Sequence, residues 1–148
     1  MDKVKFSEKE LRFLTYMRVG RLATMDGDHI HLVPMCPVFD GNVFYMGSSA
    51  KTPKVRNLRK NNKATLIIDQ YSEDWMRQVA VMMPGTVDIL EKGAEFKKAK
   101  NLLEAKYEQS KKLFPLKKGE SVILHFEPSK VVAWDYILGE FSTKSVNE

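Results

Sequence analysis

Tight-turn signals between short apolar stretches constrain the fold of this chain more than any other feature of its sequence. Asp26-Gly27-Asp28 and Asp40-Gly41 each stand between two such stretches, and Asp-Gly is among the strongest hairpin signals. Consecutive hairpins pair their strands antiparallel, and closing such a sheet into a barrel removes its exposed edges. We therefore expect a mainly β fold, a small antiparallel β-barrel with peripheral helices.

Six or seven short strands are expected, each an apolar run bounded by turn residues. Their ranges are 21–25, 29–39, 42–46, 63–69, 77–90, 121–126 and 131–137. The second contains Pro34 and Pro37, which have no backbone N–H to give to a ladder, so it should be an edge strand or bulged. Pro84-Gly85 interrupts the 77–90 stretch and predicts a bulge or sharp bend.

Three helices are predicted beside these strands. Ser7 and Glu10 have the S-x-x-E spacing of a capping box, which predicts a helix that begins there and stops at Gly20. A second helix is expected over 52–60 and a third, more charged one over 91–109.

Composition indicates the class of chain. The 148 residues suit one domain, and 43% hydrophobic with 29% charged residues is a globular balance. The single cysteine excludes an internal disulfide framework. No run of about 18 apolar residues exists, and the amino terminus lacks the apolar stretch of a secretory signal. We expect one domain over 1–148, in a cytoplasmic protein with no membrane partner.

Basic residues are concentrated in one segment of this chain, whose net charge is +5. Six basic residues and no acidic one lie between Lys51 and Lys63. Such a surplus favours an anionic partner. The segment contains no aromatic residue on which bases could stack, and we therefore expect no nucleic-acid partner.

The residues that open this segment could form a phosphate site. The chain leaves a strand, passes through Ser48 and Ser49, and enters a helix at Thr52. The first turn of a helix offers unpaired N–H groups and partial positive charge, to which the hydroxyls add donors and Lys51 and Lys54 add charge. Ordinary helix capping beside solvated lysines is the alternative that these residues leave open.

Several short motifs also follow one another in a specific order. They are Gly-Arg-Leu-Ala-Thr at 20–24, Pro34, Lys54-Val55-Arg56-Asn57-Leu58 followed by Asn61, and Trp75-Met76-Arg77-Gln78-Val79-Ala80-Val81 followed by Gly85 and Thr86. Together they resemble the pyridoxamine-phosphate-oxidase-like split-barrel flavoproteins, closely over residues 10–90 and loosely beyond. The vitamin-B6 oxidases proper carry an Arg and a Lys around the second strand and a carboxy-terminal Arg-His motif. This chain has neither, so it resembles the broader related group.

The resemblance implies a six-stranded antiparallel split β-barrel and a homodimer with flavin mononucleotide (FMN) at the subunit interface. It implies that Lys54 binds the phosphate, with Thr52 and Ser48 as nearby hydroxyl donors. The residues that it places along or beside the flavin ring are Val33, Pro34, Met35, Cys36, Met46, Gly47, Gln78 and Trp134.

The function implied is that of an FMN-binding oxidoreductase, in which bound flavin transfers hydride or electrons to a small molecule, with a nicotinamide as a candidate donor. The alternative is a non-catalytic flavin, deazaflavin or haem-binding protein. Neither the residues nor the resemblance identifies a catalytic acid or base.

Four further side chains have more ordinary explanations. His29 and His31 point to one face of a strand, but no third ligand has a suitable spacing, so we expect no metal site. His125 could ligate haem axially, although a strand histidine with ordinary partners is the expectation. Cys36 is expected to be a buried, inert thiol.

Overall fold

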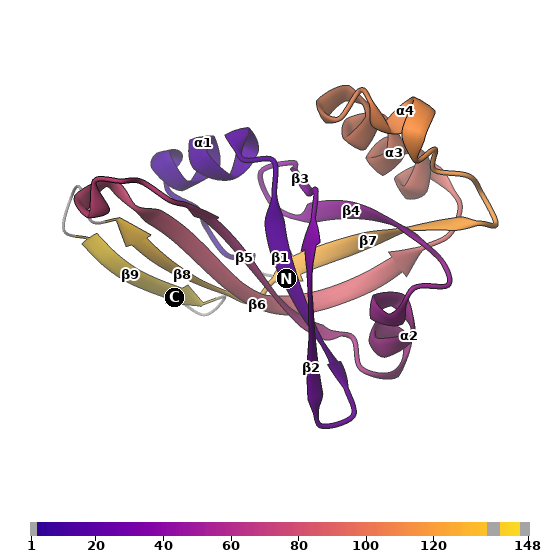
Figure 1. Ribbon diagram of the computed structural model, residues 1–148, viewed down its shortest axis with the longest axis horizontal. Helices are drawn as coiled ribbons and strands as arrows, with labels where there is room; N and C mark the ends of the chain where they lie inside the picture. Colours follow the sequence, from indigo (N-terminus) through magenta and orange to yellow (C-terminus); the bar gives the residue numbers. More distant parts are fainter. Residues whose placement is uncertain (1–2, 136–139, 146–148) are drawn as a thin grey trace.

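The computed structural model describes residues 3–135 and 140–145, which form one antiparallel sheet with few helices (Figure 1). The helices are α1 (Glu8–Tyr16), α2 (Pro53–Lys60), the single turn η1 (Trp75–Arg77), α3 (Ala94–Lys106) and α4 (Ser110–Leu113). The strands are β1 (Gly20–Asp26), β2 (His29–Met35), β3 (Val38–Phe39), β4 (Phe44–Ser49), β5 (Lys63–Gln70), β6 (Val79–Leu90), β7 (Ser121–Pro128), β8 (Lys130–Asp135) and β9 (Glu140–Ser145).

Every strand pair in the sheet is antiparallel, and the order is β2-β1-β5-β6-β7-β4-β3, with β8 on β6 and β9 on β8. The prediction of a mainly β, antiparallel fold is therefore confirmed, although the sheet does not close completely. No helix among the described residues is long and apolar enough to cross a membrane.

Strand β6 is shared by two halves of the sheet. One of its edges pairs with β5, whereas the other pairs with β8 over Val79–Met82 and with β7 over Gly85–Leu90. The predicted interruption at Pro84-Gly85 is thus a change of partner within a continuous strand. A Cβ on Gly85 would lie 2.3 Å from the Glu127 carbonyl oxygen, so only glycine permits this approach.

The interior is packed on two sides of β4. Phe44 and Met46 point into the barrel, where they join the main core with side chains of the facing strands. Tyr45 points the other way, into a smaller cluster with Phe96 and Leu103 of α3. This alternation follows the two-residue period of a strand. Strand β4 is therefore buried on both faces, with the barrel interior on one and α3 on the other.

The capping box of α1 is present: Ser7 Oγ accepts from Glu10 N at 3.2 Å, and Glu10 Oε1 accepts from Ser7 N at 2.9 Å. The helix ends at Tyr16, not at Gly20. Gly20 instead begins β1 in a crowded position, where a Cβ would lie 3.1 Å from Leu66 and Ile68 side-chain atoms. The sequence analysis also missed η1, α4 and β9, placed β4 two to three residues too early, and made α3 three residues too long at each end.

We predict that Gly85→Ala destabilises the protein by about 3 kcal/mol, the upper end of the usual cost of overpacking, because the new methyl group meets backbone rather than a flexible side chain. Urea unfolding followed by circular dichroism measures this. Thr86→Ala, one residue along and exposed, is the control and should change the unfolding free energy by less than about 0.5 kcal/mol. Equal effects of the two variants would contradict the role of Gly85.

Candidate functional site

The sheet is split where the chain passes from β2 to β3. The expected strand over 29–39 breaks at Cys36 and Pro37: β2 pairs with β1, and β3 pairs with the first two residues of β4. The outer edge of β2, and the β4 edge from Met46 to Ser49, have no strand partner among the residues the structure describes. Two open edges with free backbone groups therefore border the split.

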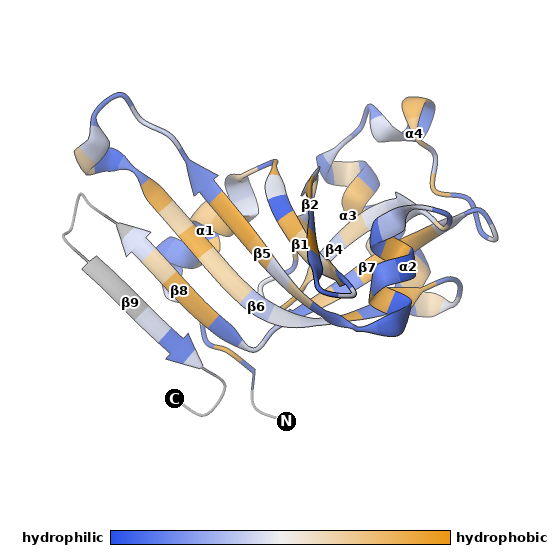
Figure 2. Ribbon diagram, turned by 60° about the horizontal axis from the view of Figure 1, so that its bottom comes forward, coloured by the Kyte–Doolittle hydropathy of each residue, from blue (hydrophilic) through white to orange (hydrophobic). Residues whose placement is uncertain are grey.

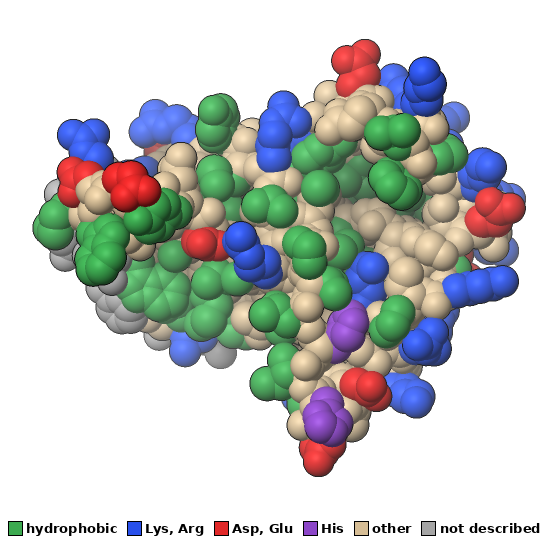
Figure 3. Space-filling view, viewed as in Figure 1, with side chains coloured by type: hydrophobic (Ala, Val, Ile, Leu, Met, Phe, Trp, Pro, Cys, Tyr) green, Lys and Arg blue, Asp and Glu red, His purple; other side chains and the backbone are tan. Residues whose placement is uncertain are grey.

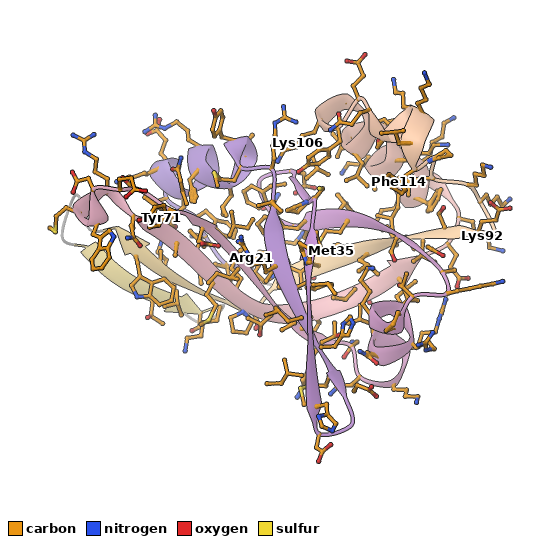
Figure 4. The ribbon with its side chains drawn as sticks, viewed as in Figure 1. Arg21, Met35, Tyr71, Lys92, Lys106 and Phe114 are labelled. Atoms are coloured by element: carbon orange, nitrogen blue, oxygen red, sulfur yellow. The ribbon has the colours of Figure 1, made fainter. Side chains whose placement is uncertain are left out.

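A cavity of about 500 Å³ lies in this split. Its lining residues come from the end of β2, from β4, and from α3 with the segment after it: Pro34, Met35, Cys36, Gly47, Ser48, Ser49, Leu103, Tyr107, Gln109, Ser110, Leu113, Phe114, Pro115, Leu116 and Ser121. Figure 3 shows the hollow in the right half of the molecule, with hydrophobic side chains above and below it. Met35 and Phe114, labelled in Figure 4, come from its two sides.

Sequence reasoning missed the wall formed by α4 and the residues after it. Leu113 and Phe114 line the cavity and are 64% and 79% exposed. The available signal was the apolar run 113–116, between two lysine pairs that were interpreted only as solvated surface. Apolar walls beside open backbone edges suit a flat ring system that has polar groups along its edge.

The start of α2 adjoins this cavity through a hydroxyl contact. Ser48 Oγ, in the cavity lining, lies 2.9 Å from Thr52 Oγ1, the N-cap residue of α2. Thr52 does not cap the helix, because its hydroxyl donates to the Ser49 carbonyl oxygen at 3.2 Å. The first turn contains no acidic residue. Figure 2 shows the basic and apolar residues of α2 as blue and orange segments.

Lys54 supplies a cation in this first turn. Its side chain is half-buried, and desolvation lowers its pKa from the usual value. It has no ion pair or hydrogen bond with any residue that the structure describes. A half-buried cation at a helix N-terminus, with no acidic residue in that turn, is an environment that an anion stabilises.

The structure therefore brings together seven of the predicted site residues. Pro34, Met35, Cys36, Gly47 and Ser48 line the cavity, and Thr52 and Lys54 follow at α2. Cys36 is exposed, which corrects the expectation of a buried thiol; its place in the strand break explains this.

The other four predicted site residues lie elsewhere. Met46 is fully buried in the core, and Val33 packs against that core. Gln78 and Trp134 line a second, shallower hollow with Arg21 and other residues, on the outer face of the sheet. Arg21 is labelled in Figure 4 and forms a 2.7 Å ion pair with Asp69 in that hollow.

The end of α3 fixes the strand break. The Tyr107 hydroxyl lies 2.6 Å from the Pro37 carbonyl oxygen and 2.8 Å from that of Arg18. Lys106 Nζ donates to the carbonyl oxygens of Met17 at 2.6 Å and Pro37 at 3.1 Å. Burial lowers the pKa of Lys106 to about 8 and raises that of Tyr107. These contacts hold one wall of the cavity to the strand break that forms the other.

His125 is not in the cavity lining. Its Nδ1 lies 3.4 Å from Glu95 and 3.7 Å from Asp88, and its ring stacks on Tyr45 under α3. His29 is exposed at the tip of the β1–β2 hairpin. Within residues 3–135 and 140–145, no group of three or more His, Cys, Asp and Glu side chains is placed to hold a metal ion.

An antiparallel sheet that is split beside a cavity, with a basic helix N-terminus next to it, defines the protein as a split-barrel fold. The family model described as pyridoxamine 5'-phosphate oxidase matches residues 6–135, and the chain belongs to this family. No curated protein matches the chain by sequence.

Solved structures share the fold at low sequence identity. A conserved hypothetical protein from Mycobacterium tuberculosis has a TM-score of 0.77 at 22% identity, over 93% of this chain and 91% of that one. An FAD-binding protein from Mesorhizobium loti has a TM-score of 0.72 at 18% identity, over 86% of this chain and 94% of that one. A heme binding protein from Mycobacterium smegmatis has a TM-score of 0.77 at 16% identity, over 91% of this chain and 55% of that one.

We predict a pH-dependent contribution of Lys106 to stability. Because its pKa falls from 10.5 in the unfolded chain to about 8 in the folded one, the unfolded state binds more protons between these pH values. The unfolding free energy should therefore rise with pH across this window, in wild type but not in Lys106→Met. Denaturant unfolding at pH 7.5, 9 and 10 measures the difference. Lys97→Met, which changes an exposed lysine of the same helix, should show the same pH dependence of the unfolding free energy as wild type. A difference between Lys106→Met and wild type that is the same at every pH would contradict the prediction.

Proposed function

We propose that this protein binds FMN in the cavity between β2 and β4 and acts as an oxidoreductase on a small molecule. The observation that carries the proposal is the half-buried Lys54 in the first turn of α2, which has no anionic partner among the described residues. The N-cap residue of the same helix, Thr52, contacts Ser48 in the lining of a largely apolar cavity. An FAD-binding protein with the same fold adds support. The phosphate would lie at Lys54 and Thr52, and the ring between the two open strand edges.

The chain's own residues would bind and orient the cofactor. Lys54 would contribute charge, Ser48 and Thr52 hydroxyl donors, and the β4 edge at Gly47 backbone groups to the rim of the ring. The walls at Phe114 and Met35 would exclude water from the ring. Bound flavin supplies the hydride or electron transfer itself, with a reduced nicotinamide as the proposed donor.

The test is the absorbance spectrum of protein purified without added cofactor, with the released pigment run against FMN, deazaflavin and haem standards. Released FMN supports the proposal, whereas deazaflavin or haem replaces FMN as the cofactor. Anaerobic bleaching by reduced nicotinamide and recovery with an electron acceptor supports an oxidoreductase. A flavin that no nicotinamide reduces favours the alternative, a flavin carrier without turnover.

We predict that Lys54→Ala weakens FMN binding at least tenfold, which is about 1.4 kcal/mol, because it removes the cation nearest the proposed phosphate. Quenching of flavin fluorescence gives the dissociation constant. Lys60→Ala, at the other end of α2 and exposed, should leave it within about twofold. Riboflavin, which has no phosphate, should bind both variants like wild type, and unchanged FMN affinity in Lys54→Ala would show that the phosphate lies elsewhere.

We also propose a homodimer formed through the outer face of β2, β1, β5 and β6. Ile30 and Leu32 on this face are 72% and 61% exposed. The strand register places Leu32 opposite Ala23, and it continues across the sheet through Thr65 to Pro84, so these four side chains form one row on this face. The row two residues further along each strand lies on the same face. An apolar face of this kind fits a second copy of the chain.

Dimerisation would complete the cofactor site. Pro34 pairs with Arg21 and Arg21 with Ile67, and the last two line the hollow of Gln78 and Trp134. A two-fold axis near this row would carry the partner's hollow toward the β2 side of the cavity. Each ring would then lie between two subunits, as the proposed positions of Gln78 and Trp134 require.

We predict that Leu32→Asp gives a monomer with at least tenfold weaker FMN binding, because it places a charge in the proposed apolar contact. Light scattering after size exclusion measures the mass, and fluorescence quenching the affinity. Asn101→Asp adds the same charge to an exposed position of α3 and should change neither. A dimer that survives Leu32→Asp with full affinity would contradict this interface.

A further inference from the structure

One buried polar atom is left without a partner. His31 Nδ1 is enclosed from solvent and makes no hydrogen bond with any residue that the structure describes. No other buried side-chain nitrogen or oxygen in the described part of the chain is in this condition. Buried polar atoms are nearly always hydrogen-bonded in folded proteins, and an exception requires an explanation. One explanation is a group that arrives from outside the chain.

The position of His31 links this atom to α2. In the β1–β2 ladder His31 pairs directly with Thr24, so the two side chains share a face of the hairpin. Thr24 Oγ1 accepts a hydrogen bond from Asn57 Nδ2 of α2 at 3.1 Å, which places α2 against this face.

Asn57 also relates His31 to the proposed phosphate position. Lys54 precedes Asn57 by three residues, one turn nearer the N-terminus of α2, so their side chains lie on the same side of the helix. Both are at least partly buried against the sheet. His31 and Lys54 therefore approach one region from the hairpin and from the helix.

An imidazole in that region can donate a hydrogen bond but finds no acceptor. Its Nδ1 donates when it carries the proton. Thr24, opposite in the ladder, accepts from Asn57 and makes no hydrogen bond with His31 Nδ1, and Lys54 offers only donors. Rotation about the Cβ–Cγ bond of this only partly buried side chain can turn Nδ1 toward an entering group.

We propose that His31 donates from Nδ1 to the phosphate of the bound flavin nucleotide and makes the site selective for phosphorylated over unphosphorylated flavin. This inference rests on the proposed function. It adds a third element to the phosphate site, the β2 strand, beside the hydroxyl pair and α2. It also predicts that the unpaired atom lowers the stability of the free protein in exchange for selectivity, since an unsatisfied buried donor destabilises a fold.

The test compares FMN and riboflavin binding, by fluorescence quenching, in wild type, His31→Leu and His31→Asn. His31→Leu should weaken FMN binding at least tenfold, leave riboflavin within about twofold, and leave the free protein at least as stable in urea. His31→Asn places an amide donor near the Nδ1 position and should recover most of the FMN affinity. His29→Leu, two residues along the strand and exposed, is the matched control and should behave as wild type.

Nuclear magnetic resonance gives a readout that packing alone would not change: the ring N–H signal of His31 should shift with FMN and stay in place with riboflavin. Equal loss of FMN and riboflavin affinity in His31→Leu, or no loss of either, overturns the inference while leaving the proposed function intact. Wild-type protein that binds neither flavin overturns the proposed function, and with it this inference.

Discussion

The strand that breaks at Cys36 and Pro37 is the constraint on which the rest of the structure depends. Antiparallel hairpins bring the two ends of this sheet together, and a continuous strand from β2 into β3 would close it along its whole length. Proline has no N–H for that ladder, so pairing ends on one side and resumes on the other. The result is a cavity between two open edges, in a sheet that is otherwise fully paired at its centre. The contacts of Lys106 and Tyr107 with the Pro37 carbonyl hold that opening in place.

The electrostatics of the site follow from the absence of an acidic residue in the first turn of α2. Surface lysines usually stand near carboxylates or in open water, whereas Lys54 is half-buried at a helix start that has no acidic residue in its first turn. The hydroxyls of Ser48 and Thr52 bond to each other and to backbone, and so remain in place without capping the helix. Burial of a cation costs free energy. The proposed phosphate site rests on this cation.

Local signals in the sequence predicted local structure well. The Asp-Gly turns, the capping box of Ser7, and the prolines of the edge strand each act through their own backbone, and each is found where expected. The cavity wall at Phe114 was missed because an apolar run in a loop has no periodicity. Strand β9 was missed because its sequence does not alternate between polar and apolar residues. The family resemblance grouped Gln78 with the cavity residues, although within one chain they line different hollows. Only the three-dimensional path of β6 separates them.

Strand β6 also restricts how this fold can vary in length. Its first third belongs to the half of the sheet with β8, and its last half to the half with β7. Because side chains alternate between faces, one residue inserted near Gly85 would turn every later side chain of the strand to the opposite face. Val87 in the core and Ile89 packed against it would exchange places with Thr86 and Asp88. Insertions and deletions among relatives should therefore occur in the loops before and after β6. The number of residues between its two halves should stay constant.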